Sequence, residues 1–359
     1  MFSLKDKQLS KKIIEKIGQE QFQLTFMHVC GTHQDSLMKH GLDSVLKEVG
    51  ITIIQGPGCP VCVTTPYEIE EMIELARNGH IITSYGDMIN VPGQKHSLDY
   101  LRTEGHNVRT VYSIEDAVQI AKQQPNKEII FMAVGFETTA PSTAAILSNN
   151  PPKNFSILCC HRLIPPALQA IIEMGEIKID GFIEPGHVAT IIGVEPFSFL
   201  SKKYQIPQVI TGFEPIDLLM ASWMLVKQIK NDAPEIQNEY ARVVSSNGNI
   251  AAQNLLKKVF QIEDKDWRGF STIPLSGYRL KEEFKEFDAR MKFAEDLKIL
   301  KNKNFSEPKG CRCGELLRGL INPEKCPLFG NKCTPHHPIG PCMVSDEGSC
   351  HISFKYTKT

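Results

Sequence analysis

The cysteines of the last 49 residues form the densest group of chemically reactive side chains in the sequence. The chain has 11 cysteines, and six of them lie in this tail: Cys311, Cys313, Cys326, Cys333, Cys342 and Cys350. Four thiolates around one centre suit either zinc or an iron–sulfur cluster. Intervals of 12, 6 and 16 residues separate the four that we predict as ligands, Cys313, Cys326, Cys333 and Cys350, with Cys311 as an alternative first ligand. These intervals fit neither a ferredoxin nor a zinc ribbon, so they leave the metal open between zinc and iron–sulfur.

A second pair of cysteines, Cys59 and Cys62, lies in the segment GPGCPVC, where a predicted strand ends and a helix begins near Pro66. The free N–H groups and dipole of a helix N-terminus stabilise thiolates, which favours reversible disulfide formation. The glycines let this loop turn sharply, and its prolines stiffen it. We therefore predict a redox-active dithiol; the alternative is one half of a structural zinc site.

Cys30 and His33 lie in the segment HVCGTHQDS, directly after the first predicted strand. A thiolate and an imidazole three residues apart offer two ligands to one iron or zinc ion. Two protein ligands leave coordination positions open, as a carrier of an iron fragment requires. The alternative is that both side chains only pack in the interior.

Polar residues follow several other predicted strands. In an open α/β sheet the carboxyl ends of the strands form the ligand crevice, so we expect these residues to face a shared cavity. They are Asp87, Glu137, His161, Arg162, Glu184 and His187. Each taken alone also suits a helix cap or a satisfied polar contact. The sequence contains neither GxxxxGK[ST] nor GxGxxG, so no motif supports nucleotide binding.

The elements that position these residues alternate between short apolar runs and amphipathic stretches, which is typical of an α/β protein with parallel sheets. We expect strands at 23–29, 51–55, 80–84, 108–112, 128–134, 156–160, 181–183 and 208–211. Segment 26–29 is echoed at 131–134, and segment 111–115 at 210–214. The echo favours two similar, doubly wound lobes of four strands each, facing a cleft.

We predict three domains from this pattern. The first, 21–125, carries Cys30 and the dithiol; the second is 126–265; the third, 266–359, is the smaller cysteine-rich domain, with helix 1–20 packed on it. The tail is too rich in Pro, Gly and Cys to build a hydrophobic core of its own. A metal centre would supply the missing stabilisation.

Composition excludes several classes of partner. The 359 residues are 42% hydrophobic and carry a net charge of −1, so no overall basic field attracts nucleic acid or an anionic membrane. Charges are scattered through the first 18 residues, and no apolar run approaches 18 residues. We expect a cytoplasmic protein, in which reductants keep ordinary thiols free and 11 cysteines indicate metal binding or redox chemistry.

The motifs occur in a characteristic order: FMHVCGTH (26–33), GPGCPVC (56–62), GFETTAP (135–141), EPGHVATIIG (184–193), then CGELLRG, CPLFG and PIGPCMVSDEGSC in the tail. In this order they resemble the HypD family of hydrogenase maturation factors over essentially the whole chain. The resemblance implies two similar α/β domains and a third domain with a [4Fe–4S] cluster, which selects iron–sulfur over zinc. It also implies a complex with a small chaperone of the HypC family.

Within that resemblance, the protein is a scaffold on which an iron ion receives two cyanides and one carbon monoxide, with cyanide delivered by a HypE-type partner. Cys30 would bind the iron together with the chaperone's N-terminal cysteine, and His33 would lie beside it. We expect electrons to enter at the cluster and the Cys59/Cys62 dithiol to exchange them two at a time. This relay requires the three sites to lie along one path, because sulfurs must meet to exchange.

Two other functions remain open on the residues alone. One is a zinc-stabilised adaptor protein without redox activity, in which the α/β lobes only bind partners. The other is a stand-alone dithiol oxidoreductase, in which Cys30 is dispensable. A scaffold that serves one client at a time, with ligands donated by partners, need not be an enzyme with a free-standing substrate.

Overall fold

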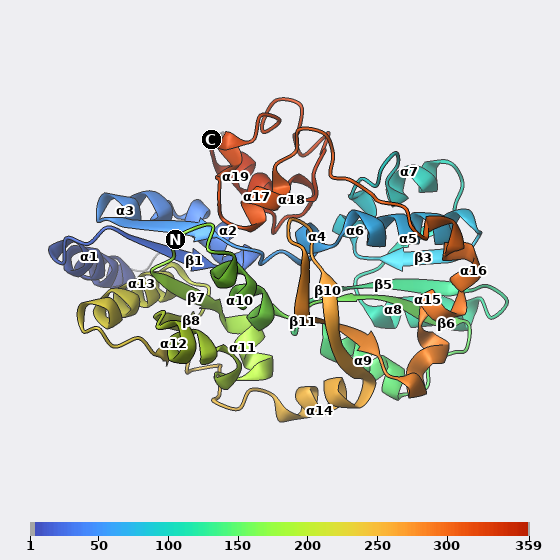
Figure 1. Cartoon of the computed structure of the whole chain (residues 1–359), viewed down its shortest axis with the longest axis horizontal. Helices are drawn as coiled ribbons and strands as arrows, with labels where there is room; N and C mark the ends of the chain where they lie inside the picture. The colour runs from blue at the N-terminus through green and yellow to red at the C-terminus, as the bar shows by residue number, and fades with distance from the viewer. Residues whose placement is uncertain (1–3, 358–359) are drawn as a thin grey trace.

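Two parallel sheets form the body of the protein (Figure 1). The structure is a computed structural model, and it describes the backbone of residues 4–357. In spatial order, the first sheet contains β2 (Ile51–Gln55), β1 (Leu24–His28), β7 (Gly181–Pro185), β8 (Gln208–Thr211) and β9 (Ile236–Asn238). The second contains β4 (Val108–Thr110), β3 (Ile81–Ser84), β5 (Ile129–Gly135) and β6 (Phe155–His161). The predicted α/β class with two parallel-sheet lobes is confirmed.

All eight predicted strands form, and every neighbouring pair in both sheets is parallel. The expectation of four strands in each lobe is wrong for the first sheet, because β9 adds a fifth strand beside β8. All three residues of β9 are only partly buried, so it lacks the buried apolar run by which the other strands were predicted.

The chain crosses between the sheets twice, so the sheets do not coincide with the predicted ranges 21–125 and 126–265. It leaves the first sheet after β2, through α4 (Pro60–Val63) and α5 (Pro66–Arg77), to build the second sheet from β3. It returns after β6 through α10 (Ile164–Met174) to β7. An apolar pattern predicts a strand but does not record which strand lies beside it.

Helices cover both sheets. Around the first sheet lie α1 (Leu4–Gln19), α2 (Gly31–Lys39), α3 (Leu42–Glu48), α11 (Gly186–Ile192), α12 (Phe199–Tyr204) and α13 (Pro215–Lys230). Around the second lie α6 (Gly86–Asn90), α7 (Leu98–Thr103), α8 (Ile114–Gln123), α9 (Ala140–Ser148) and α14 (Ile250–Val259). The expected contact of helix 1–20 with the cysteine-rich domain is wrong for its described part: α1 packs on α13, where Ile13 and Ile17 join the core of the first lobe (Figure 1).

The predicted third domain, 266–359, divides into two parts. An antiparallel hairpin, β10 (Phe260–Asp266) and β11 (Thr272–Leu280), packs on β6 and α10. Short helices follow it along the second lobe: η2 (Glu282–Phe287), α15 (Ala289–Lys292), α16 (Ala294–Leu297) and η3 (Lys298–Leu300). The cysteine-rich module begins only near Cys311 and contains α17 (Cys313–Leu317), η4 (Pro323–Lys325), α18 (Pro341–Val344) and α19 (Ser349–Thr357).

The cysteine-rich module sits above the junction of the two lobes, and the β10–β11 hairpin runs between them (Figure 1). A single hydrophobic cluster joins all three parts, with Met27 from the first sheet, Ile130 from the second and Met343 from the module. This shared core fixes the module against the carboxyl ends of the strands, because close-packed interiors leave little freedom to shift.

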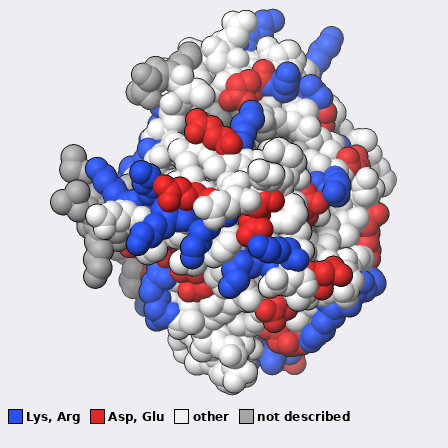
Figure 2. Space-filling model, turned by 90° about the vertical axis from the view of Figure 1, so that its left-hand side faces the viewer, with Lys and Arg blue, Asp and Glu red and all other residues white. Residues whose placement is uncertain are grey.

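The surface carries both signs of charge. Figure 2 shows Lys and Arg side chains interspersed with Asp and Glu side chains on the face of the molecule that includes α1. This mixture agrees with the net charge of −1. Within residues 4–357, none of the helices combines the length and the apolar character needed to cross a bilayer.

Candidate metal and redox site

Cys30 and the Cys59–Cys62 loop lie against each other at the carboxyl edge of the first sheet. Cys30 follows β1 and is the N-cap of α2, and the loop follows the neighbouring strand β2. The Gly56 N–H donates to the His28 carbonyl at 2.8 Å. A Cβ added to Gly58 would lie under 3.0 Å from the backbone of both Val29 and Cys30. Only glycine therefore permits this approach. Because Cys59 follows Gly58 directly in the chain, it lies next to the residue that touches the Cys30 backbone.

Cys59 and Cys62 are joined as a disulfide and are both buried. Cys59 is the N-cap of α4, and its Sγ accepts a hydrogen bond from the Cys62 N–H at 3.1 Å. The predicted helix starting at Pro66 forms after the pair, but the helix N-terminus at which the pair lies is that of a separate short helix, α4. The four-residue α4 carries Cys62, and α5 starts separately at Pro66 with Thr65 as its own cap. The predicted donor N–H at a helix N-terminus is nevertheless present.

His33 lies in the first turn of α2, fully buried, and presents one unpartnered ring nitrogen. Its Nε2 donates to the Gly212 carbonyl at 3.0 Å, which leaves the lone pair on Nδ1. No hydrogen-bond partner for Nδ1 occurs among the residues that the structure describes. Burial, with a smaller contribution from His28, lowers the pKa of His33 to about 3. The ring is therefore neutral near pH 7, the form that binds metals.

The Cys30 thiol is protonated in this state of the protein. Burial raises its pKa to about 11, although the His33 N–H acts in the opposite direction. The loop between α18 and α19 packs against Gly31, the residue after Cys30. A Cβ on Gly31 would lie under 3.0 Å from the backbone and Cβ of Glu347. The charge of Glu347 also contributes to the raised pKa. A bound cation would have to displace the proton.

Six cysteines line one small cavity inside the cysteine-rich module: Cys311, Cys313, Cys326, Cys333, Cys342 and Cys350. Burial, followed by the nearby thiols of Cys313 and Cys333, raises the pKa of Cys350 well above its ordinary value. The Ile339 N–H donates to Cys333 Sγ at 3.3 Å. In residues 4–357, no three His, Cys, Asp or Glu side chains are grouped closely enough to share a single metal ion. Soft sulfur donors converging on one apolar cavity fit an iron–sulfur cluster.

The cysteine cavity lies next to the dithiol and to Cys30. Helices α17 and α18, which carry Cys313 and Cys342, pack on α4, which carries Cys62. Helix α19, which begins at Ser349 and includes Cys350, packs on α2. The three groups of thiols, far apart in the sequence, thus meet at one junction of the fold.

The predicted residues at the strand ends divide between the two sheets. Glu184 and His187 belong to the first: His187 stacks on Phe213 at 3.7 Å between ring centroids, and Phe213 also lies 5.0 Å from the His33 ring. Glu184 is fully buried, neither of its carboxylate oxygens has a partner among the described residues, and burial raises its pKa well above the usual range. Burial therefore favours the neutral, protonated form of this carboxyl group.

Glu137 and His161 belong to the second sheet. Glu137 accepts from the Ile164 N–H at 3.0 Å, and burial raises its pKa to about 8. His161 bonds Thr143 at 3.0 Å, and burial lowers its pKa to about 4. Asp87, in α6, accepts from the Asp346 N–H at 3.2 Å and so contacts the cysteine-rich module. That these residues face one cavity stays a prediction.

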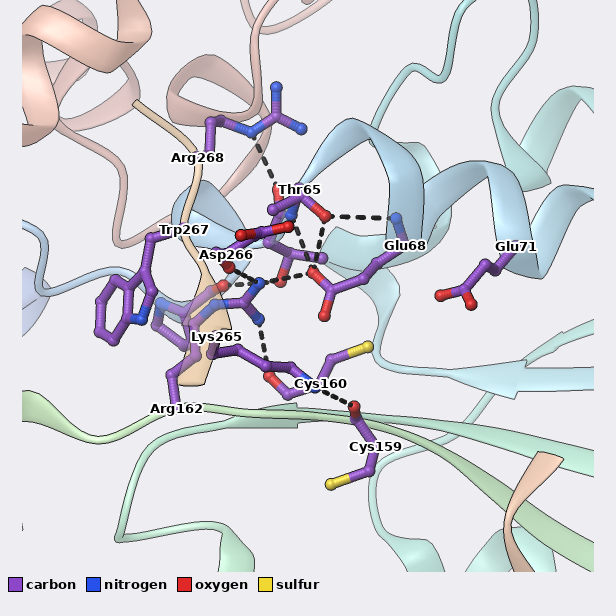
Figure 3. Close-up of polar contacts among 12 residues, drawn as sticks. Thr65, Glu68, Glu71, Cys159, Cys160, Arg162, Lys265, Asp266, Trp267 and Arg268 are labelled. Atoms are coloured by element: carbon purple, nitrogen blue, oxygen red, sulfur yellow. Dashed lines mark hydrogen bonds and ion pairs between the residues drawn. The ribbon is translucent and has the colours of Figure 1, made fainter. Parts of the chain in front are cut away.

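Arg162 does not face a ligand crevice. It is buried and forms an ion pair with Glu68 of α5, with 2.5 Å between Nη2 and Oε2. Burial alone would raise the pKa of Glu68, but Arg162, Lys265 and Arg290 outweigh it and lower the value to about 2. Figure 3 shows Arg162 directed toward Glu68 and Asp266. The sequence marks Arg162 by its place after a strand but does not indicate its partner.

Comparison with known proteins supports one family. The family model described as "HypD: Hydrogenase formation hypA family" matches residues 6–357. The chain is 46% identical over 364 residues to a putative hydrogenase expression/formation protein of Methanocaldococcus jannaschii, covering 100% of both chains. It is 41% identical to the hydrogenase maturation factor HypD2 of Bradyrhizobium diazoefficiens, with 92% of this chain and 89% of the relative covered. It is 40% identical to HypD of Azotobacter vinelandii, with 93% and 89% covered. The chain therefore belongs to the HypD family of hydrogenase maturation factors.

Proposed function

We propose that this protein is a redox-active scaffold on which the Fe(CN)2CO group of nickel–iron hydrogenases is assembled. The observation that carries the proposal is the backbone contact between Gly58 and Cys30, which seats the Cys59–Cys62 disulfide beside a buried thiol at a strand end. A stand-alone oxidoreductase would not need a second thiol and a free imidazole nitrogen at this point. The membership of the HypD family supports the same conclusion.

Iron, the cargo, would bind the Cys30 thiolate, with the unpartnered Nδ1 of His33 beside it. Two protein ligands leave positions for two cyanides, one carbon monoxide and a ligand from a partner. We infer that a small chaperone of the HypC family supplies that ligand through its N-terminal cysteine, and that a HypE-type partner donates cyanide. The neutral imidazole and the displaceable thiol proton suit the entry of a cation.

The cysteine-rich module would hold a resident [4Fe–4S] cluster through Cys313, Cys326, Cys333 and Cys350, with Cys311 as the alternative first ligand. Bound there, it would supply one-electron chemistry close to the disulfide. Reduction of the Cys59–Cys62 bond takes up two electrons and two protons and yields two thiols. The Cys62 N–H, 3.1 Å from Cys59 Sγ, is placed to stabilise a thiolate at Cys59 during that change.

The cluster is tested by the Cys326→Ala variant. We expect the wild-type protein, purified without oxygen, to be brown and to contain about four iron and four sulfide per chain, as a cysteine-ligated cluster requires. Cys326→Ala should lose most of both. Cys159→Ala is the matched control, since Cys159 is equally buried but lies on β6, outside the cysteine cavity.

The same assay decides whether Cys311 or Cys313 is the first cluster ligand. Replacing the true ligand with alanine should remove the brown colour, and replacing the other cysteine should leave it. A colourless wild-type protein with one zinc after full anaerobic reconstitution would contradict the proposal. It would favour the zinc-stabilised adaptor instead.

Iron binding at Cys30 should depend on pH through a single proton. With a thiol pKa of about 11 and a His33 pKa of about 3, only Cys30 changes protonation when iron binds near neutral pH. The sign follows directly: below pH 11 the thiol must lose a proton, so affinity for Fe²⁺ rises with pH, by about tenfold per unit. Anaerobic titration against a chelator between pH 6.5 and 8.5 measures this slope. Cys30→Ala should abolish it; a flat profile in the wild type would contradict iron binding at this thiol.

A further inference from the structure

The carboxyl end of α4, the short helix that carries the disulfide, is held by one residue of the β10–β11 hairpin. The Arg268 N–H donates to the Val63 carbonyl at 2.9 Å. The Arg268 Nε donates to the Thr64 carbonyl, also at 2.9 Å. Within the turn, the Thr64 hydroxyl donates to the Pro60 carbonyl at 2.9 Å. Three carbonyls that a four-residue helix would leave without partners are thus satisfied.

Arg268 is itself fixed in place. It is only 3% exposed, and its Nη1 forms an ion pair with Glu307. The preceding residue, Trp267, is 1% exposed, stacks on Phe136 at 5.9 Å between ring centroids, and donates from Nε1 to Ser276 Oγ at 2.8 Å. A buried guanidinium with these neighbours has few alternative positions, so its contacts to α4 are rigid.

A closed ring of polar contacts connects Arg268 back to Thr65, just beyond the end of α4 (Figure 3). Thr65, next to Thr64, donates from its N–H and its hydroxyl to Glu68 Oε2, both at 3.0 Å. Arg162 Nη2 donates to the same Glu68 oxygen and, at 2.7 Å, to the Asp266 carbonyl. Asp266 lies two residues before Arg268. The ring therefore connects three segments: the crossing after β2, through Thr65 and Glu68; the crossing after β6, through Arg162; and the hairpin, through Asp266. It lies at the C-terminal end of α4, away from Cys59.

We propose that Arg268 is a positioning residue for the Cys59–Cys62 couple: it keeps α4 helical when the disulfide is open. This inference rests on the proposed function, because it concerns the same couple. When oxidised, the disulfide itself joins the residues at i and i+3 of the turn. When reduced, that link is gone, and a single helical turn is unstable in isolation. The contacts at Val63 and Thr64 then hold the two thiols within reach of each other.

The consequence is an equilibrium that Arg268 shifts toward the disulfide. In a buffer of dithiothreitol and its cyclic disulfide, the protein disulfide accepts two electrons and two protons and opens to two thiols. Each dithiothreitol dithiol loses the same electrons and protons and closes its ring. Without the Arg268 side chain the Thr64 carbonyl would lose its partner and the open turn would relax, and closing it again would require ordering residues that are already ordered in the wild type. The disulfide would then be easier to reduce.

Arg268→Met in the full-length, metal-loaded protein tests this. We expect the equilibrium constant for disulfide formation to fall about tenfold, as when one or two further residues must be ordered before closure. The measurement is the alkylated fraction of Cys59 and Cys62 by mass spectrometry, after anaerobic equilibration over a series of dithiothreitol ratios. Arg268→Lys, with one ammonium able to reach the Thr64 carbonyl, should restore part of the loss.

Glu307→Gln is the matched control, because it removes the charge of the ion pair but keeps an amide oxygen that can accept from Arg268 Nη1, and it leaves both carbonyl contacts of α4. Its equilibrium should equal that of the wild type. Thr64→Val removes the contact to the Pro60 carbonyl within the same turn, and should shift the equilibrium in the direction of Arg268→Met. Should Arg268→Met not fold, Thr64→Val carries the test.

A folded Arg268→Met protein with the wild-type equilibrium would overturn the inference, as would an unshifted Thr64→Val protein. A merely structural role for Arg268 lowers the melting temperature without moving the equilibrium. The measurement uses purified protein and no client hydrogenase, so its failure is distinct from failure of the proposed function. That second failure would appear as maturation that survives loss of Cys59 or Cys62.

Discussion

Replacing Cys59 with alanine should reduce maturation of a nickel–iron hydrogenase to the background level while leaving the iron and sulfide content of the protein unchanged. The remaining Cys62 thiol cannot form an intramolecular disulfide with a partner three residues away, so the two-electron step is lost. The cluster should survive because Cys59 is the N-cap of α4 and lies outside the cavity lined by the six cysteines of the module. Cys62→Ala should behave in the same way, since the two sulfurs share one bond.

The measurement is hydrogenase activity in a host whose own HypD gene has been deleted and which expresses each variant at equal level. Cys159→Ala, a buried cysteine of β6 that contacts the Tyr278 carbonyl, controls for the loss of an interior thiol and should retain full maturation. Maturation that persists in both Cys59→Ala and Cys62→Ala would rule out a redox role for the pair. It would leave a scaffold that binds iron without exchanging electrons.

The strands were predictable from the sequence because nearly every one combines a short apolar run with a glycine or proline that follows it closely. Residues 181–183, for example, read as a strand, and β7 extends this only to Pro185. Residues 129–135 are buried along their whole length, as expected for a strand covered on both faces. Such signals are local, and they suffice for the α/β class and for the loops that carry Cys30 and Cys59.

The pairing of the strands was not predictable, because it depends on contacts between residues far apart in the chain. β1 pairs with β7, more than 150 residues later, and no feature of either segment selects the other. The prediction of consecutive lobes failed for this reason. The observed topology also explains where the dithiol lies. Cys59 and Cys62 follow β2, where the chain leaves the first sheet for the second, and this is the junction that the cysteine-rich module covers.

The reactive residues of the candidate site were predictable from the sequence, but the residues that pack against them and position them were not. Thiols and imidazoles stand out by type and spacing. Glu347 and Arg268 do not, because a carboxylate in a loop and an arginine in a hairpin turn are ordinary surface residues in any sequence. Their roles come from packing against Gly31 and against the end of α4. The glycines of GPGCPVC were the one sequence signal that this loop closely approaches another part of the backbone. The sequence did not show that this part is Val29 and Cys30.

The close approach of Gly58 to the Cys30 backbone leads to the second prediction with a large expected effect. Gly58→Ala should separate the disulfide from Cys30, because the new Cβ would lie under 3.0 Å from backbone atoms of Val29 and Cys30, which cannot move aside as a flexible side chain can. Either the loop or the end of β1 must shift. Overpacking of this kind costs about 1–3 kcal/mol, so we expect a lower melting temperature together with loss of maturation. Circular dichroism melting and the maturation assay measure the two effects.

Gly86→Ala separates this steric effect from the general cost of replacing a glycine. Gly86 begins α6, and a Cβ there would meet only Thr110 Cγ2, at the ordinary contact distance of 3.6 Å. Its melting temperature and its maturation activity should match those of the wild type. If Gly58→Ala also behaved like the wild type in both assays, the loop would not need to touch Cys30, and the close seating of dithiol and cargo site would lose its functional meaning. A Gly58→Ala protein that melts normally but fails in maturation would instead assign the whole effect to the displaced disulfide, because the fold would then tolerate a shift that the chemistry does not.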